Sequence, residues 1–263
     1  DLTEAAPYSG TATNTLTIKP AATKTPVITG NSSIAIIKLN GADYVTIDGS
    51  NTTGGTTKNL SIVNTSTDDF TSTIIWLNSV DASNGATNNM IKNCNLTGNA
   101  PTTTFTSLMS SGSSVGSIAE AANNNNTYQN NAFIRCQTAI AIVGPTGNET
   151  GNIITGNTIG STTAGDKLGW SGIEVYQQAN CQVTNNTVFG ITLDDLLVTS
   201  GISVYGTASN ITISGNKISD IKNTESFLGW GSNGIYLGSS STTANVNVFN
   251  NFIFDIASYG YNG

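Results

Sequence analysis

GNIITGNTI (Gly151–Ile159) can be laid without gaps over three later stretches of the chain. These stretches are NCQVTNNTV (Asn180–Val188), NITISGNKI (Asn210–Ile218) and NVNVFNNFI (Asn245–Ile253). Self-similarity at an interval of a few tens of residues is typical of proteins built from stacked structural repeats. The unit to interpret is therefore one repeat, and neighbouring repeats are expected to lie side by side.

Each repeat holds three short strands. An apolar residue recurs at equivalent places from Ile62 to Val248, at intervals of about 31 residues, without the long 3.6-residue stripe of a helical repeat. The leading strands, such as GIEVY (Gly172–Tyr176) and GISVY (Gly201–Tyr205), alternate apolar and polar residues, as expected when one face is buried. A third run follows the asparagine motif, as in 218–221. The pattern predicts an all-β solenoid of about eight triangular rungs.

Asparagine occupies one corner of the repeat. Asn157, Asn186, Asn216 and Asn251 fall in register, and each follows a glycine or another asparagine. Glycine and asparagine accept positive φ at low cost, so the dipeptide marks a sharp bend between two strands. Identical amide side chains on stacked strands can hydrogen-bond to one another. We therefore expect a structural ladder of these four asparagines.

Composition excludes several classes of partner. Nine lysine and arginine residues stand against sixteen aspartate and glutamate residues, for a net charge of −7, so nucleic acid is not an expected partner. No apolar run approaches the roughly 20 residues of a membrane helix, so membrane insertion is not expected. The three cysteines are expected to be small buried hydrophobic residues.

GADYVTIDGSN (Gly41–Asn51) and KNLSIVNTS (Lys58–Ser66), followed by the repeated units, resemble the right-handed parallel β-helices of the pectin-lyase-like superfamily. The likeness is greatest to the β-helical stretches of very large secreted bacterial surface proteins. It implies one domain over residues 1–263, with opening rungs in 1–57 and regular repeats in 58–263. It also implies an extracellular or cell-surface location and a chain that is a segment of a longer protein.

Enzymes of this superfamily act on acidic polysaccharides, and the chain departs from their patterns. Its glycosidase members share an aspartate cluster with a nearby histidine, and this sequence has no histidine. Asp68-Asp69 and Asp194-Asp195 are expected to lie in loops and not to present two carboxylates to one sugar. Its lyase members share a calcium-binding acidic cluster beside a basic residue, but the one arginine, Arg135, is expected to face solvent. No catalytic residue is predicted.

A pair of aspartates is the one candidate metal site. Asp220 and Asp255 each stand four residues after a ladder asparagine, so they should lie on adjacent strands roughly 4.8 Å apart. Two carboxylates at that distance favour a cation such as Ca²⁺. The alternative is a solvent-exposed pair offset by Lys217 or Lys222. No other cofactor is expected.

Aromatic residues mark a candidate ligand or interface surface. The outward face of the leading strands carries Tyr176, Tyr205 and Tyr236, of which the first two should stack. Trp170 and Trp230 stand just before this face. Such rings bind sugars or pack against a partner subunit, whereas tryptophans that fold back would only cover a loop.

Two functions remain open. The first is a non-catalytic extracellular structural or adhesive solenoid: a stalk, an adhesin segment or a filament subunit. It would associate end-on or laterally with copies of itself or with flanking β-helix segments, because a bare rung edge offers unpaired backbone groups. The second is a calcium-dependent, lyase-like enzyme or a binding module for acidic polysaccharide.

Overall fold

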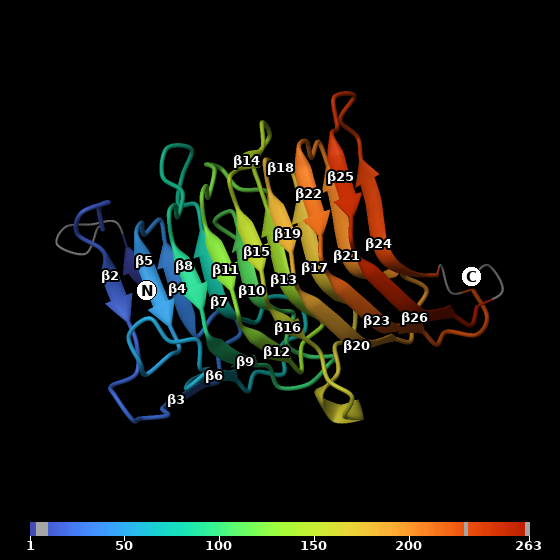
Figure 1. Cartoon of the computed structure of the whole chain (residues 1–263), viewed down its shortest axis with the longest axis horizontal. Coiled ribbons are helices and arrows are strands. Elements are labelled where there is room, and N and C mark those ends of the chain that lie inside the picture. Colours follow the sequence, from blue (N-terminus) through green and yellow to red (C-terminus); the bar gives the residue numbers. More distant parts are fainter. Residues whose placement is uncertain (4–9, 229–230, 261–263) are drawn as a thin grey trace.

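The computed structural model describes residues 1–3, 10–228 and 231–260. Its strands wind into a solenoid in which three strands make one rung, and the rungs follow one another in chain order from the N-terminal to the C-terminal end (Figure 1). The prediction of about eight rungs with three short strands each is confirmed, because each of the three large sheets holds eight strands.

Every neighbouring pair of strands in these sheets is parallel. Sheet 1 comprises β1 (Leu2–Thr3), β4 (Ile37–Asn40), β7 (Thr73–Asn78), β10 (Thr106–Ser111), β13 (Thr138–Val143), β17 (Ser171–Tyr176), β21 (Thr199–Gly206) and β24 (Ser232–Ser239). Sheet 2 comprises β2 (Leu16–Ile18), β5 (Val45–Asp48), β8 (Met90–Lys92), β11 (Thr127–Gln129), β15 (Ile153–Thr155), β19 (Gln182–Thr184), β22 (Ile211–Ser214) and β25 (Val246–Phe249). Sheet 3 comprises β3 (Val27–Gly30), β6 (Leu60–Asn64), β9 (Cys94–Thr97), β12 (Ala132–Ile134), β16 (Thr158–Ile159), β20 (Thr187–Leu193), β23 (Lys217–Asn223) and β26 (Phe252–Ser258).

Two small elements lie outside these sheets. Strands β14 (Glu149–Thr150) and β18 (Gln178–Ala179) form a two-stranded sheet. A short 3₁₀ helix, η1 (Ala164–Asp166), lies in the long turn between β16 and β17. Within the described ranges, no helix has the length and apolar character needed to cross a membrane.

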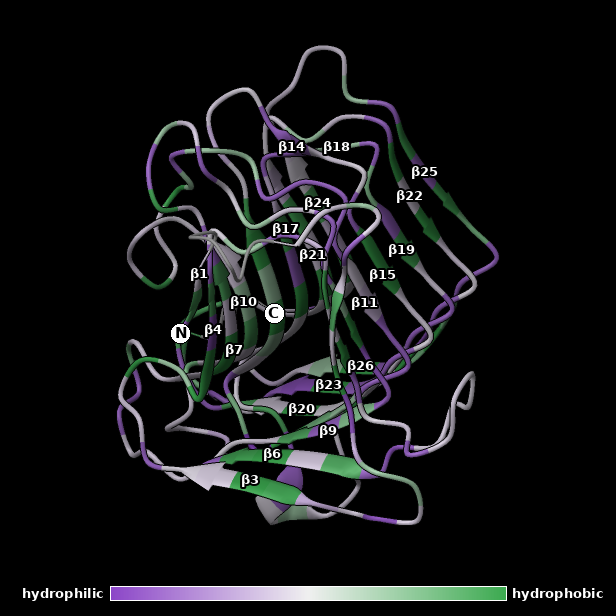
Figure 2. Ribbon diagram, turned by 90° about the vertical axis from the view of Figure 1, so that its left-hand side faces the viewer, coloured by the Kyte–Doolittle hydropathy of each residue, from purple (hydrophilic) through white to green (hydrophobic). Residues whose placement is uncertain are grey.

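The core is a stack of apolar columns. Figure 2 shows the three sheets around a common interior. In sheet 1, Ile75, Leu108, Ile140, Ile173 and Ile202 occupy equivalent positions on successive strands, and all are fully buried. The periodic apolar residues of the sequence therefore point inward, where each buried aliphatic side chain contributes about 1.5–3 kcal/mol to folding.

The corner between sheets 2 and 3 turns as the dipeptide predicts. The residue before each ladder asparagine has a positive φ: 66° at Gly156, 56° at Asn185, 68° at Gly215 and 54° at Asn250. Other side chains pay a steric penalty in this region, which explains why only glycine and asparagine stand there.

The cysteines behave as small hydrophobic residues. Cys94, Cys136 and Cys181 are all buried with unpaired thiols. Burial raises the pKa of each thiol to about 12, so all three are held protonated at neutral pH. This confirms the prediction made for them from the sequence.

Candidate functional site

The predicted asparagines form one continuous hydrogen-bonded column. Asn157 Nδ2 donates to Asn186 Oδ1 at 2.9 Å, Asn186 Nδ2 to Asn216 Oδ1 at 3.0 Å, and Asn216 Nδ2 to Asn251 Oδ1 at 2.9 Å. The backbone N–H of each donor residue reaches the same oxygen, and each amide also donates to a strand carbonyl of the preceding rung. Every polar atom of the central amides is thereby satisfied away from water.

The column extends one rung further than the sequence indicated. The backbone N–H of Asn131 donates to Asn157 Oδ1 at 2.9 Å, and the Asn131 side chain is fully buried. On the preceding rung Cys94 takes the equivalent position and donates its backbone N–H to Asn131 Oδ1. The interval from Asn131 to Asn157 is shorter than the usual repeat, which hid this member of the ladder.

A second amide column, which the sequence did not reveal, lies just before the strands of sheet 2. The backbone N–H of Asn89 donates to Asn126 Oδ1, and that of Asn126 donates to Asn152 Oδ1, each at 2.8 Å. Asn152 Nδ2 then donates to Gln178 Oε1 at 2.9 Å and to Glu149 Oε2 at 3.0 Å. This column therefore ends at a carboxyl group inside the protein.

Glu149 is fully buried and accepts three hydrogen bonds. Its donors are the backbone N–H of Asn123 at 3.1 Å, Asn152 Nδ2 at 3.0 Å and Gln178 Nε2 at 2.8 Å. Burial raises the pKa of Glu149 to about 7, although these donors favour the charged form. Because the side chain has no exposed surface, it stabilises the corner and does not meet a ligand.

The outward face of sheet 1 carries the predicted tyrosines. Tyr176 and Tyr205 are opposite one another in the register of β17 and β21. The sequence predicted that these two rings stack, but the ring that Tyr205 meets is that of Tyr236, with centroids 5.2 Å apart and planes tilted by 40°. The Tyr236 ring lies over Gly238, the residue opposite Tyr205 in the register of β21 and β24. Gly238 has no side chain to block the Tyr236 ring.

A shallow cavity of about 220 Å³ opens beside these rings. Glu174, Tyr176 and Tyr205 line it, together with Ile118 from the loop that follows β10. Glu174 is half-buried, and burial raises the pKa of its carboxyl to about 7. This face therefore combines aromatic rings with a carboxyl group that can exchange a proton near neutral pH.

Of the two predicted tryptophans, Trp170 does not join this face. Trp170 is half-buried, and its indole Nε1 donates to the Val198 carbonyl at 3.0 Å across the neighbouring turn. It lines a different cavity, between the turns that lead from sheet 3 to sheet 1. Trp230 lies outside the described residues.

The candidate metal pair is already bridged by an ammonium group. Asp220 and Asp255 occupy equivalent places on β23 and β26, as the sequence predicted. Lys222 Nζ lies 2.6 Å from Asp220 Oδ1 and 3.2 Å from Asp255 Oδ2, and Lys167 Nζ lies 2.9 Å from Asp220 Oδ2. Burial opposes ionisation of Asp220, but the two lysines outweigh it and lower its pKa. The charge that would attract a calcium ion is thus largely neutralised by the chain itself, and a Ca²⁺ site at this pair stays a prediction.

Arg135 is committed to an ion pair. Its Nε donates to Asp166 Oδ1 of η1 at 2.6 Å, and its backbone has a positive φ of 59°. The side chain therefore lies on the surface, where it fastens the long turn before β17 to the body of the solenoid.

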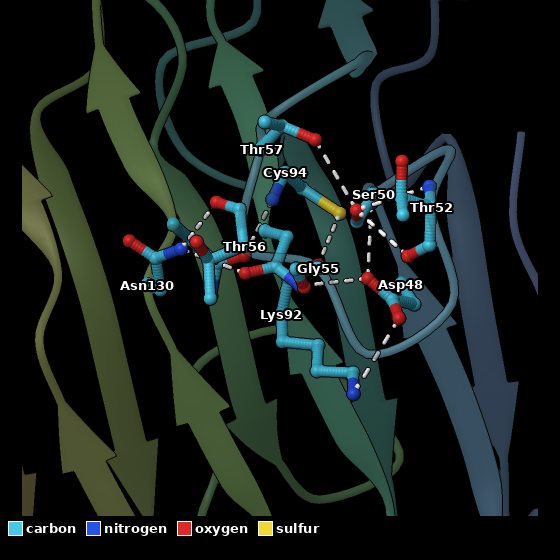
Figure 3. Close-up of polar contacts among 11 residues, drawn as sticks. Asp48, Ser50, Thr52, Gly55, Thr56, Thr57, Lys92, Cys94 and Asn130 are labelled. Atoms are coloured by element: carbon cyan, nitrogen blue, oxygen red, sulfur yellow. Dashed lines mark hydrogen bonds and ion pairs between the residues drawn. The ribbon is translucent and has the colours of Figure 1, made fainter. Parts of the chain in front are cut away.

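The first motif of the family resemblance is a structural corner (Figure 3). Asp48, at the end of β5, accepts hydrogen bonds from Ser50 N at 2.9 Å and Asn93 Nδ2 at 2.7 Å, and pairs with Lys92 Nζ at 3.4 Å. Burial opposes ionisation here too, but these partners lower the pKa of Asp48. An aspartate held anionic in this way anchors the loop after β5 and is unsuited to donating a proton.

The glycine that follows Asp48 is required by close packing. A Cβ on Gly49 would lie 1.8 Å from the Asn93 carbonyl oxygen, so no larger residue fits. Further along the same loop, the Thr56 carbonyl accepts a hydrogen bond from Asn130 Nδ2 at 2.8 Å. The loop 49–59 is therefore tied down over two rungs of sheets 2 and 3.

The acidic dipeptides lie in turns, as expected, and both turns contribute to the lining of one cavity. Asp69, Asp194 and Asp195 all line the cavity that contains Trp170. The sequence predicts that neither pair presents two carboxylates to one sugar. Asp194 and Asp195 nevertheless line the same cavity, and Asp69 lines it from a turn four rungs away.

Comparisons with known proteins agree with this geometry. A search of curated proteins found no match. A family model described as a right-handed β-helix region matches residues 35–218, which is well over half of the chain. The match begins just before β4 and ends within β23, and it includes both amide columns except for Asn251. The chain therefore belongs to the right-handed β-helix family.

Proposed function

We propose that this chain is a non-catalytic structural or adhesive β-solenoid of the cell surface, acting as a stalk, an adhesin segment or a filament subunit. The observation that carries the proposal is the continuous asparagine column, in which Nδ2–Oδ1 hydrogen bonds of 2.9–3.0 Å join four successive rungs. Together with three parallel sheets of eight strands, it favours a stiff rod roughly 35–40 Å long.

The polar groups support a structural role in a second way. Arg135, Asp48 and Asp220 are held in ion pairs that fasten turns or strands to one another. Glu149 is enclosed at the end of an amide column. These side chains stabilise the solenoid, and their hydrogen-bonding capacity is used within the protein.

The C-terminal rung supports end-on association. Val248 and Ile253 occupy the inward columns of sheets 2 and 3, yet they are 43% and 42% exposed because no later strand of the described structure covers them. Apolar side chains and unpaired strand edges of this kind favour contact with a further β-helical rung.

A turnover assay tests the non-catalytic proposal. The full chain would be incubated with uronate polymers with and without calcium, and unsaturated product would be followed by ultraviolet absorbance. We expect no product above the protein-free control, whereas steady formation of unsaturated ends would overturn the proposal.

The tyrosine face of sheet 1 favours a second candidate, a module or enzyme for acidic polysaccharide. Its support is the half-buried Glu174, with a pKa raised to about 7, beside Tyr176 and Tyr205. If the same assay gave product, Glu174→Gln should abolish it, because the amide cannot exchange the proton.

A further inference from the structure

The cavity that contains Trp170 arises from the unequal lengths of stacked turns. It is bounded by five successive connections from sheet 3 to sheet 1. The central connection, between β12 and β13, has only three residues, 135–137, whereas the other four connections are longer: 65–72, 98–105, 160–170 and 194–198. The short turn leaves a hollow of about 440 Å³, within the range of small-ligand sites.

The floor and one wall of the cavity are held rigidly. Gln137 Nε2 donates to the Asp69 carbonyl at 2.7 Å, which ties the short turn to the turn 65–72. The Trp170 backbone N–H donates to the Gln137 carbonyl at 2.9 Å, while its indole is fixed on Val198. Gly169 is required here, since a Cβ would lie 2.1 Å from the Pro101 carbonyl oxygen. The site is therefore formed before any ligand arrives.

The lining of the cavity is aromatic and acidic. Phe70, Phe105 and Trp170 supply rings, and Phe70 is 77% exposed. Asp69 comes from one long turn, and Asp194 and Asp195 from the other. Among the lining residues there is no lysine or arginine, and the ion pairs of the described chain do not involve these three aspartates. The local field therefore favours a cation and opposes an anionic polymer.

The strands beneath the cavity disfavour a peptide as the occupant. Peptides that add to a β-sheet need an unpaired strand edge. Here β7, β10, β13 and β17 are each paired on both sides within sheet 1. The surface instead offers aromatic side chains for stacking and carboxylates for hydroxyl and ammonium groups, which suits a sugar ring.

From these observations we propose that the cavity binds a cationic amino sugar, with the ring stacked on the aromatic side chains and its ammonium group paired with Asp194 or Asp195. The inference rests on the adhesive form of the proposed function and names the class of ligand that adhesion would use. It predicts the opposite charge preference to that of a module for acidic polysaccharide.

Calorimetric titration of the full chain with three sugar probes tests the proposal. The probes are a glucosamine oligomer with protonated amines, the matching N-acetylated oligomer and an oligogalacturonate. We expect the glucosamine oligomer to bind at least about tenfold more tightly than the acetylated one, because only the protonated amine forms charge-assisted hydrogen bonds with the aspartates. The oligogalacturonate should bind no more tightly than the acetylated oligomer.

Two matched variants locate the site. Asp194→Asn with Asp195→Asn should weaken binding of the glucosamine oligomer about tenfold or more. Asp81→Asn with Glu120→Gln changes the net charge equally in turns between sheets 1 and 2, away from the cavity, and should leave binding unchanged. All four carboxylates have exposed surface, and circular dichroism would verify that both variants remain folded.

Several results would overturn the inference. They are equal binding of the acetylated oligomer, preferred binding of oligogalacturonate, equal loss in the control variant, tighter binding of an oligolysine peptide, or no binding by any sugar probe. The proposed function fails separately, through turnover of a uronate polymer. A chain that binds none of these sugars and forms no product would refute only the amino-sugar site.

Discussion

Asn157 and Asn186 lie on successive rungs, and the Asn157 side chain and backbone both donate to Asn186 Oδ1, at 2.9 and 3.0 Å. Each central asparagine of the column therefore donates hydrogen bonds to the next rung and accepts hydrogen bonds from the preceding one. A change in one side chain removes hydrogen bonds from two rungs at once. This coupling makes the corner the most sensitive place in the solenoid to polar substitution.

Asn186→Ala should strongly destabilise the protein. The change leaves the Asn157 donors and the carbonyl of Ile154 unpaired in a buried corner. Each such group costs about 1–3 kcal/mol, so we expect a loss on the order of 3–5 kcal/mol. Urea denaturation followed by circular dichroism measures it.

Asn251→Ala is the matched control for this experiment. Asn251 ends the described column and is only partly buried, so water can replace the hydrogen bonds that it makes. The loss of stability in Asn251→Ala should be smaller than that in Asn186→Ala by at least about 1 kcal/mol. Equal losses at the two positions would contradict the idea that the buried ladder, and not the asparagine itself, carries the stability.

Glu149 should give the protein a specific pH dependence. Its pKa in the folded state is about 7, above the ordinary value of 4.5, so folding favours the protonated form. The stabilisation is therefore complete below about pH 4.5 and is lost as the pH rises through 7. The difference between the two pKa values corresponds to a loss of folding stability on the order of 3 kcal/mol over this pH range.

Glu149→Gln should remove this part of the pH dependence, as measured by thermal unfolding between pH 4 and 8. Glu120→Gln is the control, because the pKa of Glu120 is shifted in the opposite direction. Burial opposes ionisation of Glu120, but hydrogen bonds from Ser79 and Ser113 outweigh it and lower its pKa. A Glu149 variant whose melting temperature still falls from pH 5 to pH 8 as in the native chain would show that another group is responsible.

The sequence specified the periodic parts of this structure well. Alternation in strands such as 201–205 placed the inward side chains, and Asn216 and its equivalents marked the corner, because both features recur at every rung. The second amide column was missed because its members are unevenly spaced, and Cys181 replaces the asparagine after Asn152. Periodicity cannot reveal a column that changes residue type along its length.

The surface sites were less predictable for a related reason. Asp69 and Asp195 are far apart in sequence, and the cavity that both line depends on the short turn at Gln137, which lies between their turns. The ring partner of Tyr205 depends on Gly238, which leaves room for Tyr236. Such contacts follow from turn lengths and side-chain volumes, which the repeat does not fix.

Gly215 should tolerate asparagine but not valine. Its φ is 68°, and a Cβ there would lie 2.5 Å from the Asn185 Oδ1 atom. Asparagine already occupies the equivalent places 185 and 250 with positive φ, and the Asn185 amide can shift. A β-branched side chain is strained at positive φ whatever space it finds, at a cost of about 1–3 kcal/mol.

The free energy of unfolding of Gly215→Asn should therefore lie within about 1 kcal/mol of that of the native chain. That of Gly215→Val should lie at least about 2 kcal/mol below the native value. Urea midpoints at one pH measure both. If valine were tolerated as well as asparagine, the positive φ would not be what selects the residue at this corner.

Lys222→Met should create a response to calcium. Lys222 bridges Asp220 and Asp255, and its removal leaves two carboxylates on adjacent strands with only Lys167 nearby. Two such carboxylates favour Ca²⁺, and a ligand that binds only the folded state raises the melting temperature. We therefore expect millimolar calcium to stabilise the variant more than the native chain, in which the Lys222 ammonium competes for the same oxygens.

Lys217→Met removes a lysine of the same strand that pairs with neither aspartate and should behave like the native chain. A variant at position 222 that ignores calcium would show that these two carboxylates do not form a cation site even when released, and a native chain that responds as strongly would show that Lys222 does not compete.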